Sequence, residues 1–525
     1  MRDEPMNRRR LLRGAGAGLA TAALARTVPA LAVPPPRVRH LPEEELEALR
    51  APFSQSTDPV AHLLHRATYG VRQGELEAAR AMGAQAWLDE QLDPESIDDS
   101  ELENAVEELF PSLGLSAPEL IALSDEREDG GWENALELKK AALYRAVFTK
   151  RQLQEVMVEF WTNHFSIYHF KDVCADLKTV DDREVIRPRA LGRFRDLLHA
   201  SAKSPAMLYY LDNYANVADG PNENYGRELM ELHTIGVDAG YTQRDVEEVA
   251  RCFTGWTITI WEGEGKDGLY RFDRTTHDEG PKTVLGTAIS GGRPGHVDGK
   301  KVLDLLARHP ACARFISTKL CRRFVADVPP ASVVDKAAAT FRATDGDIKA
   351  VLRTILTSDE FFAAADQKLK RPFELVVSAL RTLGVRVEPA GIEQMIWPLY
   401  PLGQVPFEWE PPNGYPDVGG AWANTNGMLN RWNFASALVL NWFDGVTVET
   451  EKLVRRSRAR TPAALVDAFA SRLLQRSLDP ADRDRLVAYT AGDRPPGTRA
   501  PLSFLNQQAP GLLALLLSSP YFQWR

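Results

Sequence analysis

This chain contains few cysteines and few long apolar runs. Its 525 residues include four cysteines, and the order Cys-x-x-Cys-His never occurs, which excludes a covalently attached c-type haem. In an oxidising compartment four cysteines allow three disulfide pairings, among which the sequence does not choose. Two of the four lie in apolar helical patterns, so buried free thiols are an equally good interpretation of Cys174, Cys252, Cys312 and Cys321.

No apolar run beyond the N-terminus reaches the roughly 20 residues that a membrane-spanning helix needs, so we expect no transmembrane segment in the mature chain. The chain also has fewer basic than acidic residues, which gives a formal net charge of −9 at pH 7. An acidic protein repels phosphate-rich partners, which argues against binding to nucleic acid or anionic lipid. The composition, 44% apolar and 26% charged, is that of a globular protein.

The first 32 residues differ from the rest of the chain. An arginine-rich start at residues 7–13 precedes a weakly apolar Gly/Ala-rich run at residues 14–25, and Ala30-Leu31-Ala32 follows. This order predicts a twin-arginine export signal cleaved after Ala32, and hence a periplasmic or extracellular protein. The segment holds six arginines and two acids, so its removal would lower the net charge from −9 to −13. A basic disordered tail is the alternative.

Helical periodicity dominates the remainder, which predicts a mostly α fold: a multi-helix globular bundle with a small β-ribbon insertion and a long loop. Residues 33–56 are Pro-rich and then acidic, as in an N-terminal arm. From residue 57 to residue 525 we expect a single region with five segments in order. These are a helical core (57–256), a β/loop insertion (257–299), helices (300–383), a Pro/Gly/aromatic loop (384–424) and C-terminal helices (425–525).

One predicted helix, residues 223–235, carries an unusual density of ionisable groups. At 100° per residue its polar side chains share one arc of the helix. A solvated face of i,i+4 ion pairs is one interpretation. In the other, Arg227 keeps two acids ionised while Glu228 stays free for acid/base or metal chemistry, and Asn224 contacts substrate. The arc consists of Glu223, Asn224, Arg227, Glu228 and Glu231.

Two histidines, His164 and His233, are predicted on apolar faces of helices. A core histidine usually does no more than make a hydrogen bond. Two such histidines on helices that pack together could instead share a metal, a cofactor or a proton relay. Neither helix has the His-Glu-x-x-His pattern. If both rings are buried and neutral, stability should fall below about pH 6, and His164→Phe should remove most of that dependence.

Two further segments offer candidate side chains. The turn at residues 277–282 brings together His277, Asp278 and Lys282, of which only the aspartate is typical of a turn for backbone reasons. The aromatic segment at residues 397–432 includes Trp422, a candidate for stacking on substrate. Its rings are equally suited to anchoring the loop on the core. The candidate metal ligands are His164, His233 and Asp278, for a divalent ion.

The chain resembles the domain-of-unknown-function 1800 family of exported bacterial proteins. The resemblance rests on the segments His62-Leu-Leu-His-Arg-Ala-Thr-Tyr-Gly70, Trp87–Leu92, Phe160–Phe165, Asn222–Trp256, His277–Gly286 and Trp422–Phe434. It departs from the family at Gly226 and Tyr69, where alanine and phenylalanine are common. The resemblance implies an all-α exported protein, often encoded beside a second exported family similar to sulfatases and phosphatases. It implies no reaction and no ligand.

Two functions remain open from these patterns. The leading one is an extracytoplasmic, hydrolase-like enzyme that uses acid/base or metal-assisted chemistry. Its catalytic residues would be Glu228, Glu231, Arg227, His164 and His277, and its substrate contacts would be Asn224, Lys282 and Trp422. The alternative is a non-catalytic protein whose aromatic loop binds the exported sulfatase- or phosphatase-like partner or a surface polysaccharide.

Overall fold

The computed structural model describes residues 51–55, 58–127, 131–260, 262, 265–291 and 294–525. The predicted export signal and nearly all of the predicted arm therefore lie outside the described residues. Within them helices predominate and strands are short, which confirms the predicted mostly α fold. No helix of this described part is long and apolar enough to cross a membrane.

The first described helix, α2, starts at a well-formed cap. The Asp58 carboxylate accepts the N–H groups of Val60 and Ala61 at 3.0 and 3.1 Å, and Pro59 fills the first turn, where no N–H is needed. The helices of this part are α2 (Pro59–Ala67), α3 (Glu75–Met82), α4 (Ala84–Leu92), η2 (Pro94–Ser96), α5 (Ser100–Leu109), η3 (Pro111–Gly114), α6 (Ala117–Glu126), α7 (Trp132–Phe148) and α8 (Gln152–His164).

The next helices are shorter and more irregular. At the start of α13, Thr242 and Asp245 form the capping box that their spacing indicates. The order is α9 (Cys174–Val180), η4 (Asp181–Ile186), η5 (Arg187–Arg189), α10 (Phe194–Lys203), α11 (Pro205–Tyr210), η6 (Asn213–Ala215), α12 (Asn224–Glu228), η7 (Leu229–Thr234) and α13 (Gln243–Phe253).

Two small antiparallel ribbons follow α13. Strand β1 (Trp256–Ile258) pairs with β2 (Tyr270–Phe272), and β3 (Lys282–Val284) pairs with β4 (Thr287–Ile289). A short 3-10 helix, η8 (Arg274–Thr276), connects the two ribbons. Each strand spans three residues, so the ribbons depend on the helices beneath them for stability.

Helices resume for the rest of the chain. The predicted loop at residues 384–424 is partly folded: it contains β5 (Arg386–Val387), which pairs with β6 (Val446–Thr447), two short α-helices and a 3-10 helix. The helices are α14 (His296–Arg308), α15 (Pro310–Phe324), α16 (Ala331–Ala343), α17 (Ile348–Leu356), α18 (Asp359–Ala363), α19 (Pro372–Leu383), α20 (Pro389–Gln394), α21 (Leu399–Leu402), η9 (Gly419–Ala421), α22 (Thr425–Val439), α23 (Thr450–Ser457), α24 (Pro462–Leu474), α25 (Pro480–Ala491), α26 (Leu502–Ser518) and α27 (Pro520–Gln523).

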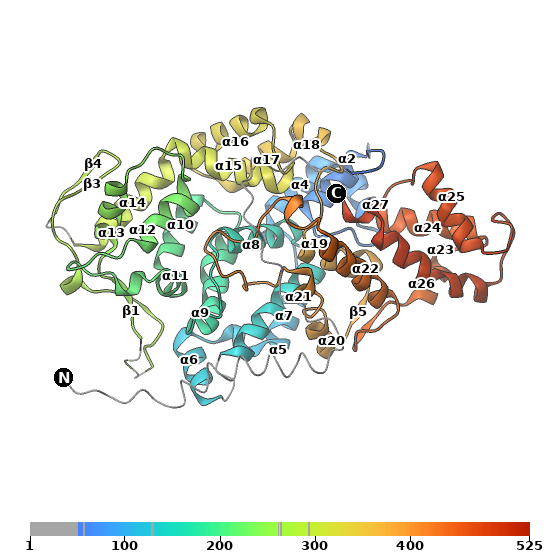
Figure 1. Cartoon of the computed structure of the whole chain (residues 1–525), viewed down its shortest axis with the longest axis horizontal. Coiled ribbons are helices and arrows are strands. Elements are labelled where there is room, and N and C mark those ends of the chain that lie inside the picture. The colour runs from blue at the N-terminus through green and yellow to red at the C-terminus, as the bar shows by residue number, and fades with distance from the viewer. Residues whose placement is uncertain (1–50, 56–57, 128–130, 261, 263–264, 292–293) are drawn as a thin grey trace.

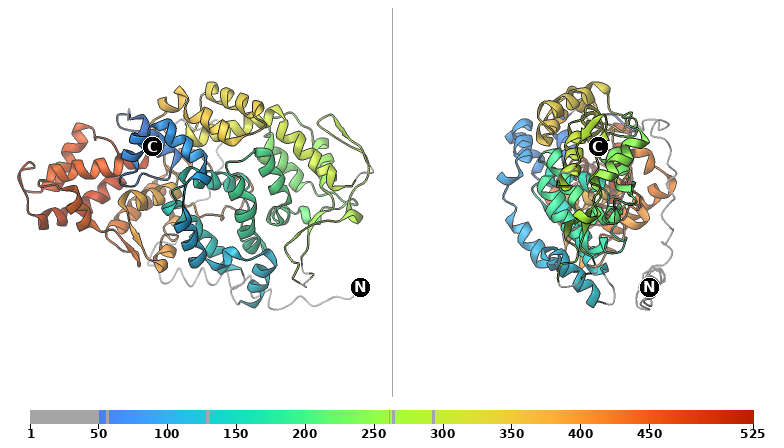
Figure 2. Two further views of the ribbon diagram at one scale, coloured as in Figure 1. Left: turned by 180° about the vertical axis from the view of Figure 1, so that it is seen from behind. Right: turned by 90° about the vertical axis from the view of Figure 1, so that its left-hand side faces the viewer.

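The molecule is elongated, with β1–β4 near one end and α23–α26 at the other (Figure 1). Viewed from behind, the same two groups of elements again lie at opposite ends of the molecule (Figure 2). Despite this shape, one hydrophobic cluster extends from α2 to α27 and includes most of the apolar residues of α19, a helix whose residues are all buried. The four cysteines are buried free thiols, and burial raises the pKa of each.

The predicted helix at residues 223–235 changes type in the middle. Its first part is the α-helix α12, but η7 is a π-helix, in which the N–H of Ile235 bonds the carbonyl of Met230 at 3.0 Å. A second π-helix, η4, follows α9. The assumption of 100° per residue therefore fails after Glu228. Single π turns inside helices are often found at functional sites.

A network of charged side chains lies inside the core, which the sequence patterns do not indicate. At its centre the buried Glu374 carboxylate accepts Arg371 at 3.1 Å, Arg525 at 2.8 Å and Arg323. Because burial disfavours their charged forms, the pKa falls to about 9 for Arg323 and to about 10 for Arg525. The remaining members of this ion network are Glu159, Asp327, Lys368 and Asp417.

Candidate functional site

The carboxylate face, which we define as Glu223, Arg227, Glu228 and Glu231, lies on one side of α12 and η7. The Arg227 guanidinium is 3.0 Å from Glu223 and 3.7 Å from Glu231, so the predicted ladder of pairs is present. Arg227 also donates to Gln243 of α13 at 2.9 Å. All four side chains are partly exposed, and this arrangement holds Arg227 between two acids.

Glu228 differs from its neighbours, since its carboxylate forms no hydrogen bond or ion pair with any described residue. Burial raises the pKa of Glu228, the negative charge of Glu231 raises it further, and Arg227 only partly offsets both. Nearby, burial and a hydrogen bond to Glu231 raise the pKa of Tyr241. The face thus contains one carboxyl group that is easier to protonate beside one that is engaged by a cation and a phenol.

The two apolar-face histidines do approach each other, directly behind this face. The His164 ring lies 6.0 Å from the His233 ring, and its Nε2 donates to the His233 carbonyl at 3.0 Å. Both side chains are buried, and His164 Nδ1 and His233 Nε2 have no partner among the described residues. Burial lowers both pKa values, to about 3 for His233 and well below the ordinary range for His164. Both rings are therefore neutral at pH 7.

The turn at residues 277–282 forms a separate buried cluster against the start of α14. Lys282 Nζ donates to Asp298 Oδ2 at 2.9 Å, and His277 Nε2 lies 3.5 Å from the same oxygen. His277 Nδ1 donates to the Thr254 carbonyl at 2.8 Å. Asp278 points elsewhere and pairs with Arg251 of α13 at 2.6 Å, which together with its other partners lowers the pKa of Asp278 against the effect of burial.

The remaining predicted substrate contacts do not lie with the glutamates in one pocket. Asn224 is exposed and donates to the Leu211 carbonyl at 3.2 Å. Trp422 is buried and donates to the Pro416 carbonyl at 3.1 Å. Its ring is 6.2 Å from that of Tyr415, so it supports the loop from behind. The aromatic segment at residues 397–432 contains Trp397, Trp409, Trp422 and Trp432, of which Trp432 of α22 alone is strongly exposed, at 46%, so they form no common surface patch.

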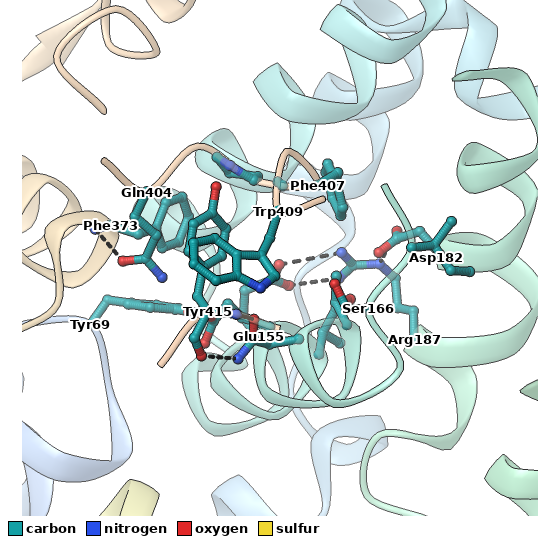
Figure 3. A pocket seen from close by; sticks show the side chains of 17 residues that line it. Tyr69, Glu155, Ser166, Asp182, Arg187, Phe373, Gln404, Phe407, Trp409 and Tyr415 are labelled. Atoms are coloured by element: carbon teal, nitrogen blue, oxygen red, sulfur yellow. Dashed lines mark hydrogen bonds and ion pairs between the residues drawn. The ribbon is translucent and has the colours of Figure 1, made fainter. Parts of the chain in front are cut away.

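A cavity that none of the predicted site residues lines lies under the same loop (Figure 3). It measures about 60 Å³ and is bounded by one face of α8 and by residues 404–415, which we call the loop cavity. Trp409 and Tyr415 cover it, with ring centroids 4.8 Å apart. Its charged lining residues are Glu155, Glu159, Asp182 and Arg187. The i,i+4 spacing of Glu155 and Glu159 on α8 is visible in the sequence, but the loop that closes over them is not.

The charges of the loop cavity are largely paired. Arg187 donates to Glu155 at 2.6 and 3.3 Å and to Asp182 at 3.2 Å. Although burial raises the pKa of Asp182, Arg187 and other cations lower it more. Glu159 instead bonds Arg371 of the ion network through Oε2, at 2.6 Å. The cavity therefore adjoins the ion network on one side.

The structure places most of the predicted residues in three groups, namely the carboxylate face, the histidine pair behind it and the cluster at residues 277–298, whereas Trp422 lies apart from all three. Nowhere in the described ranges do three or more His, Cys, Asp or Glu side chains gather as metal ligands. The divalent ion stays a prediction, tested by elemental analysis of protein purified without chelators.

Comparison with known families gives one match. A family model described as "Protein of unknown function (DUF1800)" matches residues 62–524. The chain belongs to the DUF1800 family. The match covers nearly the whole described structure: every helix and strand from α3 to α27 falls within it, and so does α2 from His62 onward. Searches of curated proteins and of solved structures found no match.

Proposed function

We propose that this DUF1800 protein is an exported, hydrolase-like enzyme whose acid/base groups are Glu228 and Glu231. The observation that carries the proposal is the unpaired Glu228 carboxyl, with its raised pKa, beside a second carboxylate that Arg227 and Tyr241 engage. Neighbouring carboxyl groups with different proton affinities are the usual arrangement for an acid and a base. Their location at the end of an α-helix, where a π turn begins, adds support.

The roles follow from these environments. Glu228, as the group that holds its proton more tightly, acts as general acid toward a leaving group. Glu231, whose carboxylate lies 3.7 Å from the Arg227 guanidinium, acts as general base on water. Arg227 orients Glu231 and balances its charge. His164 and His233 support the helix from its buried side, because neither ring reaches the surface.

The test is a hydrolysis screen with chromogenic esters, glycosides, phosphates and peptides, using Glu228→Gln and Glu231→Gln beside wild type. We expect each substitution to lower kcat by about 100-fold or more for whichever class is cleaved, since proton transfer contributes factors of that size. Glu223→Gln is the matched control: it removes the other acid that pairs with Arg227 and should change kcat less than about threefold. Equal loss in Glu223→Gln, or hydrolysis that Glu228→Gln leaves intact, contradicts the assignment.

Export is the second part of the proposal. It is supported by the order of basic, apolar and Ala-x-Ala segments in residues 7–32. Replacing Arg8, Arg9 and Arg10 together with lysine should retain the uncleaved chain in the cytoplasm, as judged by fractionation and by the mass of the product. Mature protein that still begins at Val33 outside the cytoplasm would contradict this route.

A further inference from the structure

The loop cavity contains polar atoms whose hydrogen-bonding capacity is unused. The Tyr69 side chain, 2% exposed, lines the cavity, and its hydroxyl has no partner among the described residues. The Thr162 hydroxyl, from α8, is buried in the same wall without a partner. Leaving a buried hydroxyl unsatisfied costs free energy, so two of them in one cavity indicate a missing ligand or solvent molecule.

The free positions in this wall can all accept a hydrogen bond, although each of the two hydroxyls also carries one O–H donor. Glu159 uses Oε2 to bind Arg371, and its Oε1 has no hydrogen bond within the described chain. Three nearby donor side chains are already occupied: Arg187 by two acids, Trp409 by Asn413 at 2.9 Å and Tyr415 by the Val405 carbonyl at 2.9 Å. A ligand with several N–H or O–H donors can therefore bond the free Glu159 oxygen and both hydroxyl oxygens at once.

The charged and aromatic side chains of the lining distinguish a cationic donor from a neutral one. The charged lining side chains are three acids and one guanidinium, and although Arg371 pairs with one oxygen of Glu159, the excess of acids in the lining favours a cation. The aromatic rings Phe373, Phe407, Trp409 and Tyr415 complete the lining and offer faces that attract a cation. A volume of about 60 Å³ admits a molecule of only a few heavy atoms.

We propose that the loop cavity binds a small primary ammonium compound. Its N–H groups would donate to the Tyr69 hydroxyl, the Thr162 hydroxyl and Glu159, and its alkyl part would contact Trp409 and Tyr415 (Figure 3). The site shares no lining residue with the carboxylate face, so it stands independently of the proposed hydrolysis.

Calorimetric titration and thermal unfolding of the full protein test this, with n-propylammonium chloride as the probe. We expect saturable binding with a Kd in the millimolar range or tighter and a rise in Tm. The uncharged 1-propanol should bind at least tenfold more weakly, which isolates the charge. Tetramethylammonium, which keeps the charge but has no N–H donor, should also bind at least tenfold more weakly, which isolates the hydrogen bonds.

Tyr69→Phe is the decisive variant, because it removes a hydroxyl that has no partner in the free protein. Its Tm without ligand should equal or exceed that of wild type, while its affinity for n-propylammonium should fall at least tenfold. Tyr489→Phe, at a half-exposed tyrosine outside the cavity, is the control and should bind as wild type does. Unchanged binding in Tyr69→Phe, equal binding of 1-propanol, or no saturable binding below 50 mM would each overturn the proposal, the last by leaving water as the occupant.

Discussion

The carboxylate face and the buried ion network are both built from Arg–Glu pairs, but they differ in where the charges lie. On the face, Arg227 and its acids are partly exposed, and one carboxyl group stays unpaired. In the network, Glu374 is surrounded by three guanidinium groups inside the core. Water solvates the charges of the carboxylate face, whereas the buried charges of the ion network depend on complete pairing. The same residue types therefore serve different purposes: the free acid suits chemistry and the enclosed one suits architecture.

The largest expected effect comes from breaking the network. Glu374→Gln leaves three buried guanidinium groups without their shared counter-charge and should lower the free energy of unfolding by about 3–5 kcal/mol. Chemical denaturation measures this. Glu451→Gln, in an exposed i,i+4 pair with Arg455, is the matched control and should cost less than about 0.5 kcal/mol. Similar costs for both variants would mean that burial does not separate the two kinds of pair.

The second effect concerns His164 and His233, which are buried behind the helix that carries the carboxylate face. In the folded protein the pKa values of His164 and His233 lie below the ordinary 6.5, so below that pH the unfolded chain binds protons that the folded protein does not. The contribution of these neutral rings to the free energy of unfolding is fully present above pH 6.5 and declines as pH falls toward about 3, the pKa of His233. His164→Phe should reduce the slope below pH 6 by about 1.4 kcal/mol per pH unit, one proton's worth. Denaturation curves between pH 5 and pH 8 measure it.

This expectation is weaker than the one drawn from the sequence, which assigned most of the acid sensitivity to the pair. Burial also lowers the pKa of His62 to about 2, of His65 to about 3 and of His169 to about 4. Each of these rings contributes in the same direction, so His164→Phe leaves a substantial acid dependence. An unchanged slope would show that His164 is protonated or exposed in the fold.

The contrast between the two regions also explains what the sequence reveals. Arg227 and its acids are neighbours on one helix, so spacing alone predicts their pairing and leaves Glu228 free. The network joins Glu159 of α8, Arg323 of α15, Glu374 of α19 and Arg525, which only the tertiary fold brings together. The loop cavity was missed for the same reason, since residues 404–415 close over α8 from a distant part of the chain.

A third substitution tests how strongly the face depends on its cation. Arg227→Gln removes two partly exposed pairs, at 3.0 and 3.7 Å, and should lower stability by less than about 1 kcal/mol. Because Arg227 lowers the pKa of Glu228, the same change should raise that pKa further. Carbon-13 NMR titration of labelled glutamate measures the shift. A fall in the pKa of Glu228 would contradict the assigned electrostatics.

The smallest effect is that of Glu228→Gln on stability. The pKa of Glu228 is raised in the fold, so its protonated form is favoured there. Its stabilising contribution is therefore present below the ordinary pKa of 4.5 and is lost as pH rises through the folded value. A glutamine does not ionise, so the variant should be more stable than wild type at pH 7 by about a few tenths of a kcal/mol, given partial exposure to solvent. The difference should vanish near pH 4, whereas Glu223→Gln, which loses an ion pair with Arg227, should be slightly destabilised at pH 7. A Glu228→Gln protein that is less stable than wild type at neutral pH would show that the carboxylate has a partner, and the face would then resemble the ion network more than an acid/base site.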